Sequence, residues 1–351
     1  MQAYALTKRF YQDKASSLSH KVFAVAPMVD WTDRHYRFFA RLLSKHALLY
    51  TEMIVADAIL HGDKQKILGF SAEERPLSLQ LGGMDSAKLV EAVKIAEDFG
   101  YNEINFNVGC PSNRVHAGSF GACLMLEPNS VGDCIAAMQG ATSLPVTVKC
   151  RIGVDDQIPD IALRDLIKCI KNTGIKGGVW IHARKALLKG LSTSENRKIP
   201  KLDYELVYAI KKEEPNLFIG LNGGLENMQQ ALKVLPHVDG VMLGRAAYQN
   251  SRILTSIDEN FMNPLTGEPP IQPQEIDKDF WKKVGHSLSD YAARHIASGG
   301  KIRHISRHIM GLFHGFSQAR RCRHILSCEA NNPEATHKVI EKAFNLMIES
   351  L

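Results

Sequence analysis

Short apolar segments alternate with longer helical patterns from about residue 20 to residue 250, and this alternation constrains the fold more than any other feature. Eight segments have the length and apolar, β-branched character of buried strands; they span 22–26, 48–51, 77–81, 103–107, 146–149, 179–182, 218–221 and 240–243. Between them lie amphipathic patterns, such as Tyr36, Phe39, Ala40 and Leu43 behind a candidate helix cap at Thr32. Eight strands with intervening helices over about 230 residues predict an α/β fold of the (β/α)₈ TIM-barrel type. A doubly wound sheet is the alternative.

The chain changes character after residue 256. Residues 257–280 are rich in proline and acidic side chains, which predicts a linker. Beyond it, apolar residues recur at helical spacing over 302–316 and again over 339–347, and no convincing strand follows. We therefore predict a barrel domain over 1–256, a linker over 257–280 and a small all-helical domain over 281–351.

Composition indicates the compartment and the class of partner. No run of about 18 apolar residues is present, so we expect no membrane span, and residues 1–19 lack the apolar core of a secretory signal. Seven cysteines without a Cys-x-x-Cys pair are typical of reduced cytoplasmic thiols. Neither they nor the 14 scattered histidines have metal-ligand spacing. We expect a cytoplasmic monomer without a metal, and the net charge of +6 weakly indicates a polyanionic partner.

Cys110 is the candidate catalytic residue. It lies in Asn107-Val108-Gly109-Cys110-Pro111, where an apolar strand runs into a tight turn. Reactive side chains of a barrel lie at the C-terminal ends of its strands. A single cysteine is most often a small buried apolar residue, but the flanking asparagines and the Gly-Cys-Pro turn favour a reactive position for Cys110.

Other predicted strands also end in polar or glycine-rich residues. The candidates for a cofactor site are Pro27, Met28, Val29, Gln80, Lys149, His182, Asn222, Gly223, Gly224, Gly244 and Arg245. Glycines after the last two strands let backbone N–H groups approach a phosphate, and Arg245 or Arg184 can add a charge-assisted bond. Each residue alone could simply cap a strand. Together they suit FMN, which needs a phosphate site, hydrogen bonds to its ring from Gln80 and a cation such as Lys149.

Seven motifs, in order across the barrel, resemble the motif series of the tRNA-dihydrouridine synthases. They are Ala26-Pro27-Met28, Leu79-Gln80-Leu81-Gly82-Gly83, Asn107-Val108-Gly109-Cys110-Pro111, Val148-Lys149-Cys150-Arg151, His182-Ala183-Arg184, Asn222-Gly223-Gly224 and Gly244-Arg245. The segment 191–197 and the helical tail further resemble the DusA subfamily, whose members act on uridines 20 and 20a of the tRNA D-loop.

The resemblance implies a flavoenzyme that reduces the C5–C6 double bond of uridine in tRNA. NADPH would reduce bound FMN, the flavin would deliver hydride to C6, and Cys110 would protonate C5 from the opposite face. The cofactor candidates would hold FMN, and Asn107 would contact the uracil or its nucleotide. No Gly-x-Gly-x-x-Gly fingerprint is present, so we expect NADPH to dock transiently.

The tRNA needs contacts outside the catalytic pocket, because its target base must be extruded and most of the affinity comes from phosphates. No Asp or Glu occurs from Tyr291 to Cys328. The predicted tRNA contacts in this tail are Arg303, Arg307, Arg320 and Arg323, and those in a basic loop at the barrel rim are Arg184, Lys185 and Arg197.

Two other functions stay open. An FMN barrel could reduce a free pyrimidine, as a relative of dihydroorotate dehydrogenase, although a basic tail has no purpose in such an enzyme. The chain could also be a tRNA-binding or tRNA-folding protein with an idle catalytic centre, although Cys110 and the flavin residues are all present.

Overall fold

The computed structural model describes Tyr11, residues 21–112 and residues 120–351. Of the N-terminal stretch 1–19, on which the expectation of no secretory signal rests, only Tyr11 is among the described residues. None of the helices that are described combines the length and the apolar character needed to cross a bilayer.

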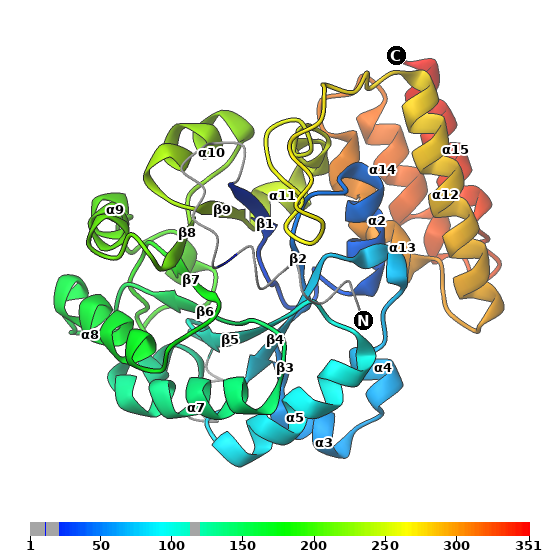
Figure 1. The fold of residues 1–351 in the computed structure, drawn as a ribbon. Coiled ribbons are helices and arrows are strands. Elements are labelled where there is room, and N and C mark those ends of the chain that lie inside the picture. The colour runs from blue at the N-terminus through cyan, green and yellow to red at the C-terminus, as the bar shows by residue number, and fades with distance from the viewer. Residues whose placement is uncertain (1–10, 12–20, 113–119) are drawn as a thin grey trace.

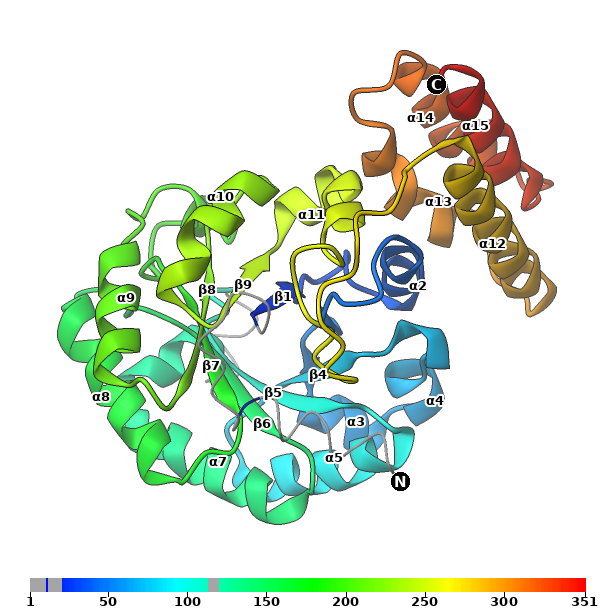
Figure 2. The ribbon, with the colours of Figure 1, turned by 45° about the horizontal axis from the view of Figure 1, so that its top comes forward.

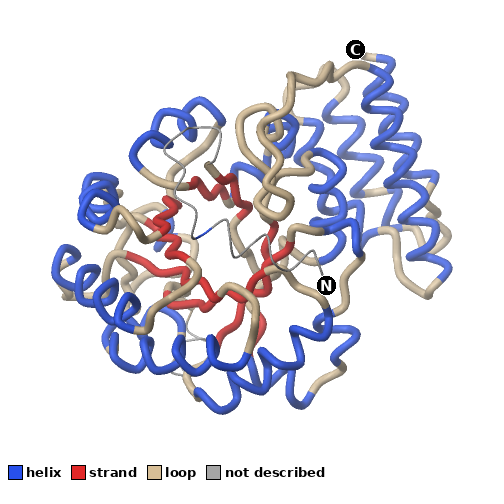
Figure 3. Tube along the Cα trace, viewed as in Figure 1, coloured by secondary structure: helices blue, strands red, loops and turns tan. Residues whose placement is uncertain are grey.

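Parallel strands form the wall of a barrel (Figures 1 and 3). They are β1 Val22–Val25, β2 Leu49–Tyr50, β3 Ile54–Val55, β4 Leu77–Gly82, β5 Glu103–Val108, β6 Val146–Arg151, β7 Gly178–His182, β8 Phe218–Asn222 and β9 Gly240–Leu243. Their order is β1-β9-β8-β7-β6-β5-β4-β2, with the short β3 on the edge of β4. A parallel bridge between Ala24 and Leu48 joins β1 to β2 and closes the ring. The eight predicted strands are confirmed, and the doubly wound alternative is wrong.

Helices surround the strands, as the view of Figure 2 shows. They are α2 Arg34–Leu43, α3 Ala56–His61, α4 Lys64–Leu68, α5 Ser86–Phe99, α7 Pro128–Ala141, α8 Pro159–Asn172, α9 Tyr204–Glu213, α10 Met228–Val234 and α11 Arg245–Gln249. Short 3₁₀ turns lie between them, at Ala72–Glu74, Gly121–Leu126, Glu195–Arg197, Leu235–His237 and Ser251–Ser256. The predicted cap at Thr32 is wrong by one residue. Asp33 caps α2, because its carboxylate accepts the N–H groups of His35 and Tyr36, whereas the Thr32 hydroxyl pairs with Met28.

Trp180 fills the interior of the barrel. It is fully buried, and Gly220 on β8 and Gly240 on β9 make room for its ring. A Cβ atom at Gly220 would lie 2.1 Å from Cε3 of Trp180, so a larger residue there would displace the indole. The indole therefore fills the interior of the barrel beneath the strand ends that carry the site.

The tail is helical and contains α12 Lys278–Ala297, α13 Arg303–Ile309, α14 Ala319–Ser327 and α15 Lys338–Glu349, with 3₁₀ turns at Met310–Phe313 and Glu329–Asn331. Both predicted apolar stripes face its interior; Ile305 and Ala343, for example, are fully buried. The tail packs beside α2 and α11 of the barrel, as Figures 1 and 2 both show. Rings of Phe38 and Tyr291 stack across this contact with centroids 4.0 Å apart.

The segment between the last 3₁₀ turn of the barrel and α12 has neither helix nor strand over 258–277. Its first part packs on the barrel: Phe261 is fully buried against Phe23, with ring centroids 5.4 Å apart. The division of the chain at 256 and 281 stays a prediction.

Candidate active site

Cys110 lies on a turn directly after β5 and is partly exposed. Oδ1 of Asn107 accepts two backbone N–H groups of this turn, from Gly109 at 3.1 Å and from Cys110 at 3.0 Å. An asparagine side chain commonly closes a tight turn in this way. The carbonyl of Cys110 also accepts the N–H of Ala122 at 2.9 Å. The predicted catalytic residue is thereby fixed at the C-terminal end of the barrel wall.

A chain of side-chain amides continues from Asn107 into the barrel. Nδ2 of Asn107 donates to Oε1 of Gln80 at 2.8 Å, and Nε2 of Gln80 donates to Oδ1 of Asn105 at 2.7 Å. The side chains meet because Gln80 is the register partner of Asn105, and Asn107 faces the same side of β5 two residues later. An amide oxygen can accept two hydrogen bonds and its NH₂ can donate two. Gln80 is thus held from within the protein and keeps capacity for a ligand.

The amide chain ends on a buried carboxylate. Nδ2 of Asn105 donates to Oγ1 of Thr147 at 2.9 Å, and the Thr147 hydroxyl donates to Glu103 at 2.7 Å. Tyr50 and Ser78 donate to the same carboxylate, both at 2.8 Å. Burial raises the pKa of Glu103, and these hydrogen bonds act in the opposite direction. We call Asn107, Gln80, Asn105, Thr147 and Glu103 the amide relay; each of its donors points from the cysteine turn toward Glu103, so the bonds polarise one another.

Arg151, at the end of β6, ties the cysteine turn to the loop after β7. Its Nε donates to the carbonyl of Gly109 at 2.9 Å, and its Nη1 donates to the carbonyls of Lys185 at 2.9 Å and Asn196 at 3.0 Å. Only 3% of Arg151 is exposed. The sequence predicts no role for Arg151, although this residue follows a predicted strand and ends the motif Val148-Lys149-Cys150-Arg151.

Basic side chains gather at this end of the barrel, and none of them forms an ion pair with a carboxylate among the described residues. They are Lys149, Arg151, Arg184, Arg197 and Arg245. Burial, together with the charge of Arg151, lowers the pKa of Lys149 to about 8. Burial and the same group of cations lower the pKa of His182, which keeps that ring neutral. Unpaired positive charge in a partly buried site favours an anionic ligand.

The ends of β7 and β8 lie side by side, because His182 is the register partner of Asn222. Gly223 follows with a φ of 108°, a region that favours glycine. A Cβ atom at Gly223 would lie 2.5 Å from Cδ2 of His182, so only glycine fits there. Nδ2 of Asn222 donates to the carbonyl of Met242 at 2.7 Å and links β8 to β9. The predicted phosphate loop therefore borders the basic cluster.

The ends of β1 and β9 complete the rim. Pro27, Met28 and Val29 follow β1, and Gly244 follows β9. A Cβ atom at Gly244 would lie 3.3 Å from Sδ of Met28, so the two loops are in close contact. Val29 is 60% exposed, which leaves its side chain accessible to a ligand. The structure thus brings the predicted cofactor residues to one end of the barrel.

The rim loop after β7 holds the predicted tRNA contacts of the barrel. Nη1 of Arg184 donates to the carbonyls of Lys198 at 3.2 Å and of Pro200. Arg184 therefore shapes this loop. Arg197 is exposed and Lys185 is partly exposed.

The four predicted arginines of the tail differ in their surroundings. Arg303, Arg320 and Arg323 are exposed. Arg307 is exposed as well, but its Nη2 lies 2.6 Å from the carboxylate of Asp33. Arg307 therefore also joins α13 to the start of α2.

The chain is similar to known proteins along nearly its whole length. The family described as dihydrouridine synthase (Dus) matches residues 24–348. A tRNA-dihydrouridine(20/20a) synthase of Salmonella typhi is 46% identical over 337 residues, which cover 96% of this chain and 98% of the relative. Proteins of the same description from Yersinia pestis and Escherichia coli (strain K12) are each 47% identical and cover 93% of this chain and 91% of their own length.

Proposed function

Because this chain belongs to the dihydrouridine synthase family, we propose that it reduces the C5–C6 double bond of uridines 20 and 20a in the D-loop of tRNA. The chain is an oxidoreductase of a flavin-dependent family that uses NADPH. The observation that carries the proposal is the cysteine turn, which Asn107 holds at the edge of a basic cluster that forms no ion pair with a described carboxylate. The dihydroorotate dehydrogenase-like and idle-protein alternatives have no comparable support.

The chemistry of the donor set fits FMN. Lys149 is a partly buried cation without a carboxylate partner among the described residues, and Gly223 brings its backbone against His182. We propose that Pro27, Met28, Val29, Gln80, Lys149, His182, Asn222, Gly223, Gly224, Gly244 and Arg245 hold the cofactor. When bound, FMN supplies the hydride that is added to C6 of the uracil.

The protein's own residues then supply position and a proton. Cys110 is the proposed donor to C5, and the hydrogen bonds of Asn107 and Arg151 to its turn keep the thiol where the base must arrive. Asn107 is the proposed contact to the uracil or its nucleotide. It suits this role because its hydrogen bond to Gln80, the next member of the amide relay, holds its side chain in place.

For tRNA we propose phosphate contacts on both parts of the chain. Arg303, Arg320 and Arg323 are exposed on the tail, and Arg197 is exposed on the rim loop. Arg307, Arg184 and Lys185 belong to the same two surfaces; Arg307 would have to share its guanidinium between Asp33 and a phosphate. We also propose that the protein works as a cytoplasmic monomer, with NADPH docking only transiently.

The test uses the purified full-length chain with FMN, NADPH and a tRNA transcribed without modifications. We expect dihydrouridine at positions 20 and 20a, mapped by reverse transcription and mass spectrometry, and no reduction of free uridine or of orotate. Product from the free pyrimidine alone would favour the small-molecule oxidoreductase. Failure to form dihydrouridine with bound flavin present would favour the idle tRNA-binding protein.

A further inference from the structure

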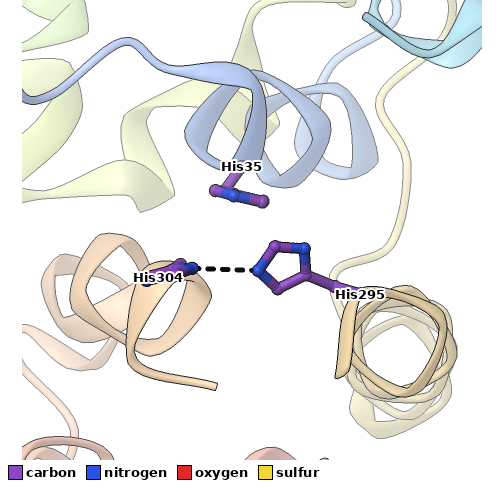
Figure 4. A group of neighbouring side chains, drawn as sticks. All are labelled: His35, His295 and His304. Carbon is purple, nitrogen blue, oxygen red and sulfur yellow. Dashed lines mark hydrogen bonds between the residues drawn. The ribbon is translucent and has the colours of Figure 1, made fainter. Parts of the chain in front are cut away.

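Three imidazoles, one from the barrel and two from the helical tail, meet where the tail packs on the barrel (Figure 4). His35 comes from α2, His295 from α12 and His304 from α13. Each offers a ring nitrogen, and these nitrogens all lie within 4.8 Å of one another. Nε2 of His295 and Nδ1 of His304 are 3.0 Å apart. The scattered histidines of the sequence predicted no metal, because ligands some 260 residues apart have no recognisable spacing.

Tyr291 orients the first of these rings. Its hydroxyl lies 2.8 Å from Nδ1 of His35, and its ring is packed on Phe38. With the Nδ1 proton directed at this hydroxyl, the lone pair of Nε2 is available to a ligand. Histidines that bind metals are held in this way by a partner on their second nitrogen.

The three rings differ in their access to solvent. His35 is almost buried, whereas His295 and His304 are partly exposed, so an ion can enter from the solvent side.

We propose that His35, His295 and His304 bind one divalent transition-metal ion, with Zn²⁺ as the representative, and that this ion fastens the helical tail to α2. A set of three imidazoles without a carboxylate ligand suits zinc and its neighbours, and does not suit Mg²⁺ or Ca²⁺. Tetrahedral Zn–N bonds of about 2.0–2.1 Å place the nitrogens about 3.3 Å apart. Nε2 of His295 and Nδ1 of His304, 3.0 Å apart, are already near this spacing, and the nitrogen of His35 lies within 4.8 Å of both. Water would occupy the fourth position.

Such an ion would act on the geometry of the whole molecule. The tail carries Arg303, Arg320 and Arg323, whereas Cys110 lies on the barrel. Fixing α12 and α13 to α2 fixes the distance between these basic residues and the catalytic turn. The ion would therefore be structural and would take no part in the reduction.

The experiment titrates ZnCl₂ into the full-length protein, freed of metal by chelator, and follows heat by isothermal titration calorimetry. We expect one equivalent to bind, with a rise in melting temperature. His295→Gln and His304→Gln should each abolish this equivalent. The matched control is His286→Gln, which removes an exposed histidine of α12 that lies 3.4 Å from Asp290; it should bind zinc like the wild type. Tyr291→Phe should weaken binding by about tenfold.

Two results would overturn the proposal. One is the absence of a zinc equivalent in the wild type, which would leave the histidines as a hydrogen-bonded cluster. The other is equal zinc affinity in the wild type and in His304→Gln, which would assign the ion to other residues, such as the exposed Cys328. His304 is partly exposed, so its variant is expected to fold, and the melting curve of the metal-free variant checks this. Neither result depends on the proposed reduction of tRNA.

Discussion

The side-chain oxygen of Asn107 accepts the backbone N–H of Cys110 at 3.0 Å, so the strand that ends at Val108 directly positions the thiol that follows it. The same asparagine donates to Gln80 through its amide nitrogen. One residue therefore connects the cysteine turn with the interior of the barrel. Asn107 therefore holds both Cys110, the proposed proton donor, and Gln80, the proposed flavin contact. For this reason, substitutions in the amide relay should change the position of the thiol.

The first prediction concerns the proton. Cys110→Ala should still bind FMN and tRNA, because the turn is held by backbone groups, but dihydrouridine formation should fall by about 10²–10⁴-fold. Single-turnover reaction of the reduced enzyme with tRNA measures the step. Cys169→Ala, at a partly exposed thiol on the outer helix α8, is the matched control and should behave like the wild type. An unchanged rate in Cys110→Ala would remove the thiol from the mechanism.

The second prediction concerns Arg151. Arg151→Lys keeps the positive charge but loses the planar guanidinium, which donates to three carbonyls. The hydrogen bonds that join the cysteine turn to the loop after β7 should therefore be lost. We expect the reductive step on tRNA to slow by about 10²-fold, as misplacement of a reacting group by about 1 Å does. The control is Arg164→Lys on α8, whose guanidinium pairs with Asp160 at the surface. Equal rates for the two variants would show that the fork does not position the thiol.

The third prediction concerns the stability of the amide relay. Asn105→Leu removes the acceptor of the buried Gln80 Nε2, whereas the Thr147 hydroxyl loses one hydrogen bond and keeps its bond to Glu103. A buried polar group left without a partner costs about 1–3 kcal/mol, so we expect the free energy of unfolding in urea to fall by about 1–3 kcal/mol. Asn129→Ala, at an exposed asparagine, should change it by less than about 0.5 kcal/mol. A loss in Asn105→Leu no larger than in this control would show that the relay is not part of the barrel's stability.

The strands and their ends could be predicted from the sequence because parallel strands buried on both faces form continuous apolar runs. Topology then brings the ends of such strands to one rim, so Cys110 and Lys149 could be assigned to one site without coordinates. The contacts of Arg151 could not, since they join the turn after β5 to the loop after β7, and the relative heights of these two segments depend on the strand register. The cap at Thr32 failed for a simpler reason: the carboxylate of Asp33, one residue later, is in place to accept two N–H groups.

The fourth prediction concerns pH. The pKa of Lys149 is lowered to about 8 in the protein without ligand, and a bound anion must raise it. FMN affinity should therefore be full below pH 8 and fall as the pH rises through 8, because the unliganded protein then loses the ammonium proton that the complex retains. Fluorescence titration of FMN between pH 6.5 and 9.5 measures this. Lys149→Met should bind FMN more weakly at pH 7 and should show a flatter profile. A profile that is identical in the variant would assign the phosphate or ring contact to another cation.

The last prediction concerns the tail. Arg320 and Arg323 are exposed on α14, in a stretch without acidic residues, and neither forms an ion pair with a described residue. If both contact phosphates, Arg320→Ala with Arg323→Ala should weaken tRNA binding and reduce the slope of log K against log salt by about one unit for each contact. Filter binding at several salt concentrations gives both quantities, with Arg164→Ala on α8 as a control that removes a surface charge from the outer wall of the barrel. A lower affinity with an unchanged slope would mean that the two residues hold the tail in shape and do not touch the tRNA backbone, since only a lost phosphate contact changes the number of released counterions.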